Sequence, residues 1–216
     1  MVGGWRGQGG RSRGWMTRRH IHYESAFEDL LQSQGVPYVA VDEAKKPIFA
    51  GAKVKCFDFL VYGGGGAKWL ADVKGRRFPY ETVSGRRYWE NWVTGEDLAS
   101  LPCWEAAFGE GFVAAFVFAY WLDGPECSWP GGGVHAYRGR YYGFLAVPLS
   151  EYQALCRRRS PRWDTYFVAP AAFRRIARPV GTWWEDGSRT TTTSLPVAGA
   201  AYNEDGRVVE RPRGKG

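Results

Sequence analysis

Two carboxylates and a lysine interrupt apolar segments of this 216-residue chain. Asp58 lies between two phenylalanines, and Asp72 lies in the segment WLADVK, two positions before Lys74. A charged group inside an apolar strand is costly unless it is paired or bound to a metal. Neighbouring carboxylates repel each other, and a hard divalent cation with oxygen ligands relieves that repulsion. The pattern predicts a Mg²⁺ (or Mn²⁺) site at which Lys74 orients water or stabilises charge on a phosphate.

A third carboxylate is expected from a helix over residues 22–34. Its apolar stripe is formed by Tyr23, Phe27, Leu30 and Leu31. Glu24 borders this stripe and is the predicted third ligand, with Glu28, one turn later, as the alternative. The structural alternatives are an ordinary surface ion pair between Asp72 and Lys74, and a hydrogen-bonded structural role for Asp58.

Three short strands are expected to hold the two aspartates. Residues 36–41, 55–62 and 69–74 are rich in β-formers, and four glycines at 63–66 form a turn between the last two. Asp58 and Asp72 are therefore expected on neighbouring strands. Because side chains alternate along a strand, Asp72 and Lys74 should point to the same face.

The rest of the chain alternates between predicted helices and strands. Thr94 is expected to cap a helix over residues 96–108, with Asp97 completing a loose capping box and Pro102 bending it. Further strands are expected at residues 112–121, 141–147 and 165–168, and further helices at residues 151–158 and 171–177. This order predicts an α/β fold in which helices flank a mixed central β-sheet.

A helix glutamate, a strand aspartate and a D-x-K strand, in this order, resemble the PD-(D/E)XK nuclease superfamily. The matching pieces are HYESAFEDLLQSQGVPYVAV, FDFLVY and LADVKGRR. The layout is most similar to that of archaeal Holliday-junction resolvases and related small endonucleases, in which Glu24 fits the helix position better than Glu28. The resemblance covers residues 20–121. The opening His22-Tyr23-Glu24 also resembles that of a bacterial protein family with no assigned function.

The resemblance implies a restriction-endonuclease-like core of order α-β-β-β-α-β. It also implies a Mg-dependent endodeoxyribonuclease that hydrolyses phosphodiester bonds in DNA, with Glu24, Asp58 and Asp72 as metal ligands and Lys74 as catalytic lysine. The alternative is a catalytically inactive module of the same fold that binds nucleic acid or a protein partner. The chain departs from the pattern in having Phe57 where the superfamily has proline, and Asp72 where glutamate is commoner. The oligomeric state stays open, a homodimer included.

Two groups of arginines could contact nucleic acid. Arg76, Arg77, Arg86 and Arg87 follow the D-x-K strand in a segment, residues 75–95, that is expected to be a loop. They are predicted to contact phosphates, and a solvated basic loop is the alternative. The second group, in the segment RRRSPRW at residues 157–163, is interpreted as the basic end of a helix rather than as a base-stacking surface.

Charge and composition define the expected domains. The five arginines of residues 1–19 supply most of the net charge of +7, and residues 181–216 are balanced, so the middle carries +2. We expect a disordered basic arm at 1–19 that adds salt-sensitive affinity for DNA, a nuclease-like domain at 20–180 and a disordered tail at 181–216. No segment has the length of a membrane span, and the expected location is cytoplasmic. Four cysteines without C-x-x-C spacing and three histidines argue against zinc.

Overall fold

The computed structural model describes most of the expected α/β domain. The described residues are 18–42, 48–49, 52–81, 87–124, 129, 131–184, 201–202 and 208–209. Most of the basic arm and most of the tail lie outside them, so the predictions made for those segments stay predictions. Among the described residues, no helix is long and apolar enough to cross a membrane.

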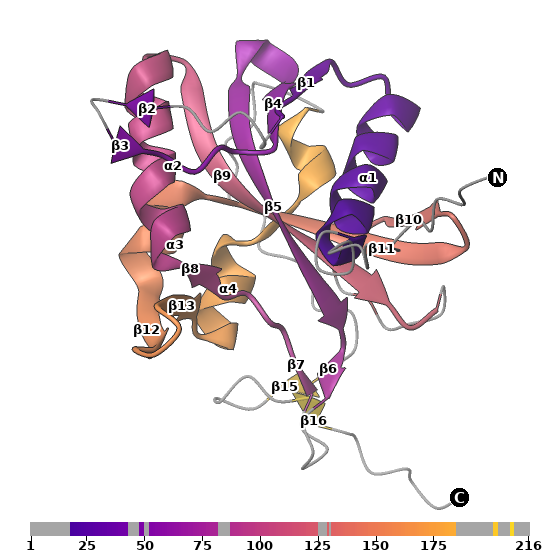
Figure 1. Ribbon diagram of the computed structural model, residues 1–216. Coiled ribbons are helices and arrows are strands. Elements are labelled where there is room, and N and C mark those ends of the chain that lie inside the picture. The colour runs from indigo at the N-terminus through magenta and orange to yellow at the C-terminus, as the bar shows by residue number, and fades with distance from the viewer. Residues whose placement is uncertain are drawn as a thin grey trace, which may run out of the picture.

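The secondary structure begins with a long helix and continues mainly as strands (Figure 1). The first half contains α1 (Arg18–Ser33), β1 (Tyr38–Ala40), β2 (Ile48–Phe49), β3 (Ala52–Lys53), β4 (Phe59–Tyr62), the 3-10 helix η1 (Gly64–Gly66), β5 (Lys68–Phe78), β6 (Tyr80–Glu81), β7 (Arg87–Tyr88), β8 (Val93–Thr94) and α2 (Gly95–Phe108). The second half contains β9 (Phe112–Leu122), β10 (Val134–Tyr137), β11 (Arg140–Pro148), α3 (Leu149–Leu155), β12 (Cys156–Ser160), β13 (Thr165–Val168), α4 (Pro170–Ile176), β14 (Arg178–Pro179), the 3-10 helix η2 (Val180–Trp183), β15 (Ala201–Tyr202) and β16 (Val208–Val209).

The central sheet is mixed, with strand order β1-β4-β5-β9-β11-β10 and β14 added to β11. Among the strands of the described residues, β5 and β9 are the one parallel pair; their register pairs Lys68 with Phe112 and Phe78 with Leu122. The parallel pair requires a crossover, and α2 supplies it. Apart from the short strands β2, β3, β6, β7 and β8, the elements α1, β1, β4, β5, α2 and β9 come in the predicted α-β-β-β-α-β order, and the predicted fold class is confirmed.

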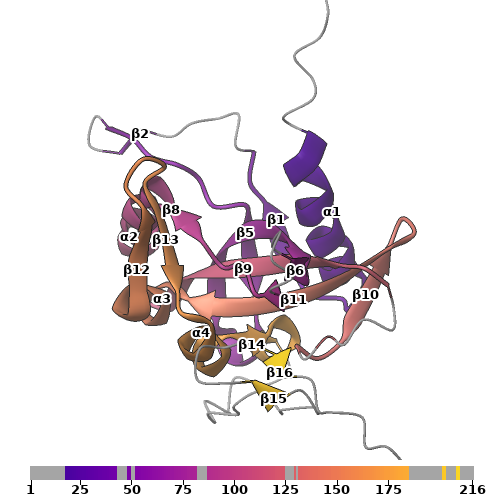
Figure 2. The same ribbon diagram turned by 90° about the horizontal axis from the view of Figure 1, so that it is seen from below.

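Helices cover both faces of the sheet (Figure 2). The apolar stripe of α1 packs on one face, where Phe27 and Leu31 are buried against Val73 of β5 and small residues of β9. The opposite face of β9 carries Phe116, which packs with residues of α2, α3 and α4 in the second apolar cluster. Because successive residues of a strand point to opposite faces, β5 alternates between the two clusters along its length.

Three details of the predicted secondary structure are wrong. Residues 75–95 are not a loop, because β5 continues to Phe78 alongside β9 and three short strands follow it. The predicted helix over residues 151–158 ends at Leu155, because the next five residues form β12 and pair with β13. The predicted strand over residues 55–62 begins only at Phe59, after a bend at residue 58. Just past the predicted domain boundary at residue 180, Trp183 is buried and stacks on Trp69 at 3.9 Å.

The first turns of α1 lie directly on β5 because Gly75 has no side chain. A Cβ at Gly75 would lie 2.1 Å from the Tyr23 ring. Tyr23 also meets Tyr142 edge-on at 6.1 Å, and the Tyr142 hydroxyl is 2.9 Å from His22 Nδ1. This contact fixes the part of α1 that carries Glu24.

We therefore expect Gly75→Ala to destabilise the protein by about 1–3 kcal/mol, as overpacking of a close contact does. The control is Gly133→Ala, whose Cβ would meet no atom within 4 Å. That variant should stay within about 0.5 kcal/mol of wild type. Urea unfolding monitored by circular dichroism measures both, and equal stabilities of the two variants would contradict the close packing of Tyr23 on β5.

Candidate functional site

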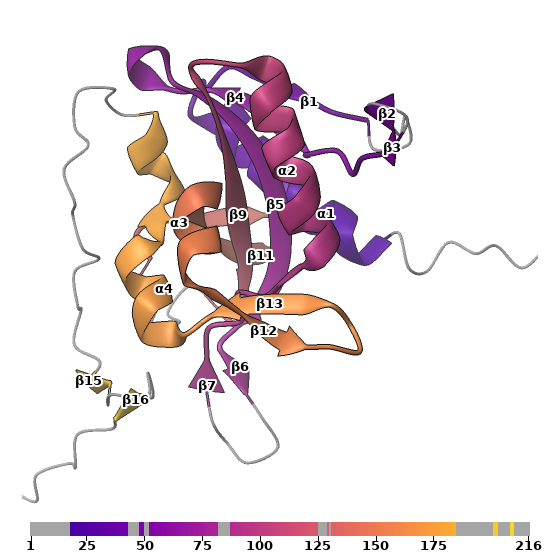
Figure 3. The same cartoon turned by 90° about the vertical axis from the view of Figure 1, so that its left-hand side faces the viewer.

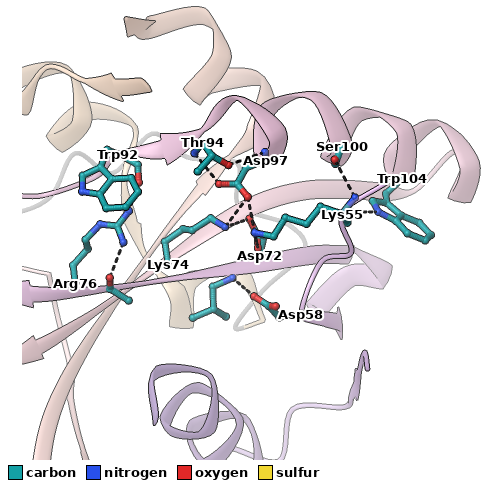
Figure 4. A network of polar contacts seen from close by, with 12 residues as sticks. Lys55, Asp58, Asp72, Lys74, Arg76, Trp92, Thr94, Asp97, Ser100 and Trp104 are labelled. Carbon is teal, nitrogen blue, oxygen red and sulfur yellow. Dashed lines mark hydrogen bonds and ion pairs between the residues drawn. The ribbon is translucent and has the colours of Figure 1, made fainter. Parts of the chain in front are cut away.

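A network of four charged side chains lies between β5 and α2 (Figure 4). Lys74 Nζ is 2.5 Å from Asp72 Oδ2 and 3.0 Å from Asp97 Oδ1. Lys55 Nζ reaches the same two acids, at 3.8 Å from Asp72 and 2.6 Å from Asp97. Asp72 and Asp97 are almost fully buried, whereas the Lys55 side chain is 31% exposed. Asp72 and Lys74 share one face of β5, and Lys55 connects their network to the surface.

The N-terminus of α2 holds Asp97 in place. The Thr94 side chain accepts a hydrogen bond from Asp97 N–H, and Asp97 Oδ2 accepts one from Thr94 N–H at 2.8 Å. This capping box confirms the one predicted for these two residues. It leaves Asp97 Oδ1 directed at the two ammonium groups, so that the cap of the helix also organises the charges over β5.

The network shifts the pKa values of its members in opposite directions. Burial would raise the pKa of Asp97, but Lys74 and Lys55 outweigh burial and hold that pKa below its ordinary value. Burial would lower the pKa of Lys55, but the carboxylates of Asp72 and Asp97 raise it. For Asp72, burial dominates and raises the pKa despite the two ammonium groups. Asp97 is therefore the firmly ionised acid of the network.

Asp58 stands immediately before β4 and interacts with the backbone of β5. Its N–H donates to Ala71 O at 2.9 Å, and its Oδ2 accepts from Val73 N–H at 2.5 Å. In Figure 4 the β5 ribbon separates Asp58 from the Lys74 network. Burial, then the charges of Asp72 and Glu24, raise the pKa of Asp58 well above its ordinary value of 3.8. Asp58 is thus a buried carboxyl group with two other acids, Asp72 and Glu24, close enough to affect its pKa.

The two candidate acids on α1 point to different neighbours. Glu24 is half-buried, and its charge is one of those that raise the pKa of Asp58. Glu28 Oε1 instead accepts a hydrogen bond from the Tyr38 hydroxyl at 2.9 Å, beside β1. Of the pair, Glu24 is the acid whose charge acts on Asp58.

The donor set suits a hard divalent cation by its chemistry. Glu24, Asp58, Asp72 and Asp97 place four carboxyl groups around β5, beside the two ammonium groups of Lys55 and Lys74. Among the described residues, however, no three His, Cys, Asp or Glu side chains are close enough together to hold a metal. Binding a cation therefore requires Asp72 to leave Lys74, and Asp58 to leave the Val73 amide.

The arginines predicted to contact phosphates differ in their surroundings. Arg76 is buried: its guanidinium donates to Trp92 O, lies 4.0 Å from the centre of the Trp92 ring, and has a pKa lowered by burial. Arg76 is therefore part of a strand and not of the predicted loop, because β5 turns this side chain inward, and the phosphate contact predicted for it stays a prediction. Arg77 is exposed and forms an ion pair with Asp123 at 2.9 Å. Arg86 and the side chain of Arg87 lie outside the described residues.

Replacing Asp58 should reveal the cost of its buried charge. The pKa of Asp58 is higher in the folded protein than in the unfolded chain. Its contribution to the free energy of unfolding is therefore fully present below pH 3.8, where the carboxyl group is neutral, and is lost as the pH rises through the raised pKa. Asparagine keeps an oxygen for the Val73 amide but stays neutral, so Asp58→Asn should stabilise the protein at pH 7 by about 0.5–2 kcal/mol. The gain should vanish near pH 3.

Urea unfolding at several pH values measures this effect, and Asp123→Asn is the exposed control that should change little. A variant that is less stable than wild type at pH 7 would show that Asp58 is an ordinary stabilising acid.

Sequence reasoning missed the role of two residues in the site. Lys55 was expected only as the first residue of a strand, and Asp97 only as a helix cap. The sequence did contain a pattern that could have identified Asp97. The helix that begins at Gly95 connects two parallel strands, and an acid in its first turn lies over the first of these strands, which carries Asp72 and Lys74. Nothing near Lys55 in the sequence indicates that it would reach Asp72 and Asp97.

Comparisons with known proteins find remote structural similarity alone. No protein-family model matches the chain, and no curated protein matches it. Among solved structures, the chain is similar to Hjc, a Holliday junction resolvase from the archaeal hyperthermophile Archaeoglobus fulgidus, with 10% identity and a TM-score of 0.43. The similarity covers 75% of this chain and 97% of Hjc. At this level of similarity, the function of the chain has to be argued from its own residues.

Proposed function

We propose that this chain is a divalent-metal-dependent endonuclease that hydrolyses phosphodiester bonds in DNA. The observation that carries the proposal is the buried group of acids around β5. Asp72 and Lys74 share one face of the strand. Asp58 stands at the start of the neighbouring strand, and the charges of Asp72 and Glu24 raise its pKa. Burial of this many acids costs stability, and a functional site is the usual reason for such a cost.

In this proposal Glu24, Asp58 and Asp72 would supply oxygen ligands, which requires Asp58 and Asp72, drawn on different sides of the β5 ribbon in Figure 4, to move toward each other. A bound Mg²⁺ would polarise the scissile phosphate and lower the pKa of a bound water. Lys74, released from Asp72 and retained by Asp97, would keep its ammonium group beside the reacting phosphate and stabilise the charge that develops there. Asp97 serves as the positioning residue for Lys74, because its Oδ1 lies 3.0 Å from the Lys74 ammonium group and Asp97 is not one of the proposed metal ligands.

The test is the nicking of supercoiled plasmid DNA by the purified chain. Cleavage should require Mg²⁺ or Mn²⁺ and should stop when a chelator is added. Cleavage that continues in excess chelator would contradict metal dependence. A protein that binds DNA without nicking it under any divalent ion would contradict the enzymatic proposal.

One observation favours a second candidate function, a catalytically inactive module of the same fold. Lys74 is held between two acids at 2.5 and 3.0 Å, which is the geometry of a closed structural ion-pair network. If that network never opens, the chain would bind nucleic acid or a partner protein without cleaving it. The plasmid assay separates this module from the enzyme, because only the enzyme responds to divalent ions by nicking.

A further inference from the structure

The hairpin formed by β12 and β13 carries the most basic exposed segment of the described domain. We call residues 156–168 the arginine hairpin; between Cys156 and Thr165 it holds four arginines and one aspartate. Its exposed basic side chains are those of Arg157, Arg158, Arg159 and Arg162. The sequence interpretation as a basic helix end is wrong, because these residues follow α3 as a strand. The helix dipole therefore does not explain them.

Trp163, at the tip of the arginine hairpin, is 70% exposed. Hydration of a large aromatic ring is unfavourable, and the described large apolar side chains are otherwise at most about half exposed. The Arg162 guanidinium lies 5.2 Å from the centre of the Trp163 ring. An exposed ring beside a guanidinium is the combination on which an unpaired base stacks, because every base has a flat face.

The arginines of the hairpin are available to an anion. Arg158 pairs with Asp164 at 3.5 Å, but both side chains are more than half exposed. An exposed pair of this kind is worth only about 0–1 kcal/mol, so a phosphate can replace the carboxylate at little cost. Arg158 is therefore not held in a closed network, in contrast to the lysines over β5, whereas Arg159 pairs at 3.4 Å with Glu90, whose side chain is only 15% exposed.

The arginine hairpin is joined firmly to the candidate site (Figure 3). Thr165 of the hairpin pairs with Thr94, the N-cap of α2, and Gly95 N–H donates to Asp164 O at 2.8 Å. A Cβ at Gly95 would lie 2.0 Å from Asp164 Oδ2, so the tip packs tightly on the first residue of α2. The same helix turn carries Asp97, which contacts Lys74.

A second connection runs through Trp92. Arg159, from the hairpin, lies 5.7 Å from the centre of the Trp92 ring, and Arg76 of β5 lies 4.0 Å from it. Arg76 is two residues after Lys74 on the same face of β5. Ligand contacts on the hairpin and chemistry at Lys74 would thus take place on elements that contact one another directly.

We infer that the arginine hairpin binds a single-stranded segment of nucleic acid, with Trp163 stacking on an unpaired base and the arginines contacting the flanking phosphates. The inference adds a substrate class to the proposed function. It rests on that proposal only for the position of the cleaved bond, near Lys74. A duplex would meet the same arginines, but its bases are stacked on one another and cannot cover Trp163. Affinity that depends on Trp163 is therefore the property that identifies an unpaired partner.

Fluorescence anisotropy with labelled oligothymidylate tests the inference, using the full chain in a chelator so that no cleavage occurs. Trp163→Ala should weaken binding about 5- to 150-fold, the range for loss of one base–aromatic stack, whereas Trp163→Phe should keep most of the affinity. Affinity should fall with salt concentration less steeply when Arg157, Arg158 and Arg162 are replaced with glutamine. The slope of the logarithm of the binding constant against the logarithm of the salt concentration should decrease by about 0.7 per lost phosphate contact. Arg138→Gln, in the turn between β10 and β11, is the exposed control and should leave affinity unchanged.

Three results would overturn the inference: wild-type affinity in Trp163→Ala, no binding of the single strand by the wild type, or duplex binding that is equally tight and equally sensitive to Trp163. Failure of the hairpin and failure of the proposed nuclease are distinguishable, because plasmid nicking is measured separately. Nicking that survives in Trp163→Ala, together with unchanged binding, removes the hairpin proposal alone. Trp163-dependent binding by a chain that never nicks DNA removes the nuclease proposal alone.

Discussion

Asp72→Asn is expected to reduce divalent-dependent DNA cleavage by about 100-fold or more, the usual scale for removing one charge-stabilising group from an active site. The substitution keeps the size of the side chain but removes the negative charge that a cation on β5 needs. Lys74→Ala should reduce cleavage to a similar extent, because it removes the ammonium group beside the phosphate. Initial rates of plasmid nicking at saturating Mg²⁺ measure both effects.

Both residues are buried, so loss of activity must be separated from loss of the fold. Circular dichroism and thermal unfolding of each variant provide that control, and Asp123→Asn provides an exposed carboxylate that should keep wild-type activity. If folded Asp72→Asn and Lys74→Ala both nick DNA at the wild-type rate, the cleavage belongs to another site or another protein.

Asp97→Ala is expected to lower the free energy of unfolding by about 3 kcal/mol. Breaking a buried ion pair from one side leaves an uncompensated charge, which costs about 3–5 kcal/mol, and here Asp72 remains to compensate part of it. The substitution also removes the side-chain half of a capping box, worth about 1 kcal/mol. Urea unfolding at pH 7 measures the sum.

Two further variants divide that sum into its parts. Asp97→Asn keeps an oxygen for the Thr94 amide and loses only the charge, whereas Thr94→Ala loses the cap and keeps the charge. The lowered pKa of Asp97 means that its stabilisation is present above pH 3.8 and is lost as the pH falls. The difference between wild type and Asp97→Asn should therefore shrink below about pH 4. Equal losses in Asp97→Asn and Thr94→Ala at pH 7 would contradict the dominance of the charge.

The fold could be predicted from the sequence because its core elements carry strong local patterns. The stripe on α1, the apolar run of β9 and the glycine turn before β5 each specify an element without reference to the rest of the chain. The continuation of β5 through Arg76 could not be predicted in this way. Those residues are polar and basic, and they form a strand because β9 alongside supplies their hydrogen bonds.

The candidate site was only partly accessible from the sequence. Alternation along a strand places Asp72 and Lys74 on one face, as predicted. The position of Asp58 relative to that face depends on the bend at residue 58, immediately before β4, and no sequence pattern predicts this bend. The contributions of Lys55 and Asp97 arise from contacts across 17 and more positions of the chain, which periodicity cannot reveal.

The central claim is that the acids around β5 hold a divalent cation. Crystals of the protein soaked in Mn²⁺, with anomalous scattering recorded at the manganese edge, test it most directly. The account predicts an anomalous peak bordered by oxygens of Asp58 and Asp72, with the Lys74 ammonium group moved away from Asp72 and retained by Asp97. Crystals without such a peak at these two residues, in which Lys74 still closes on Asp72, would contradict it and leave the group as a structural ion-pair network.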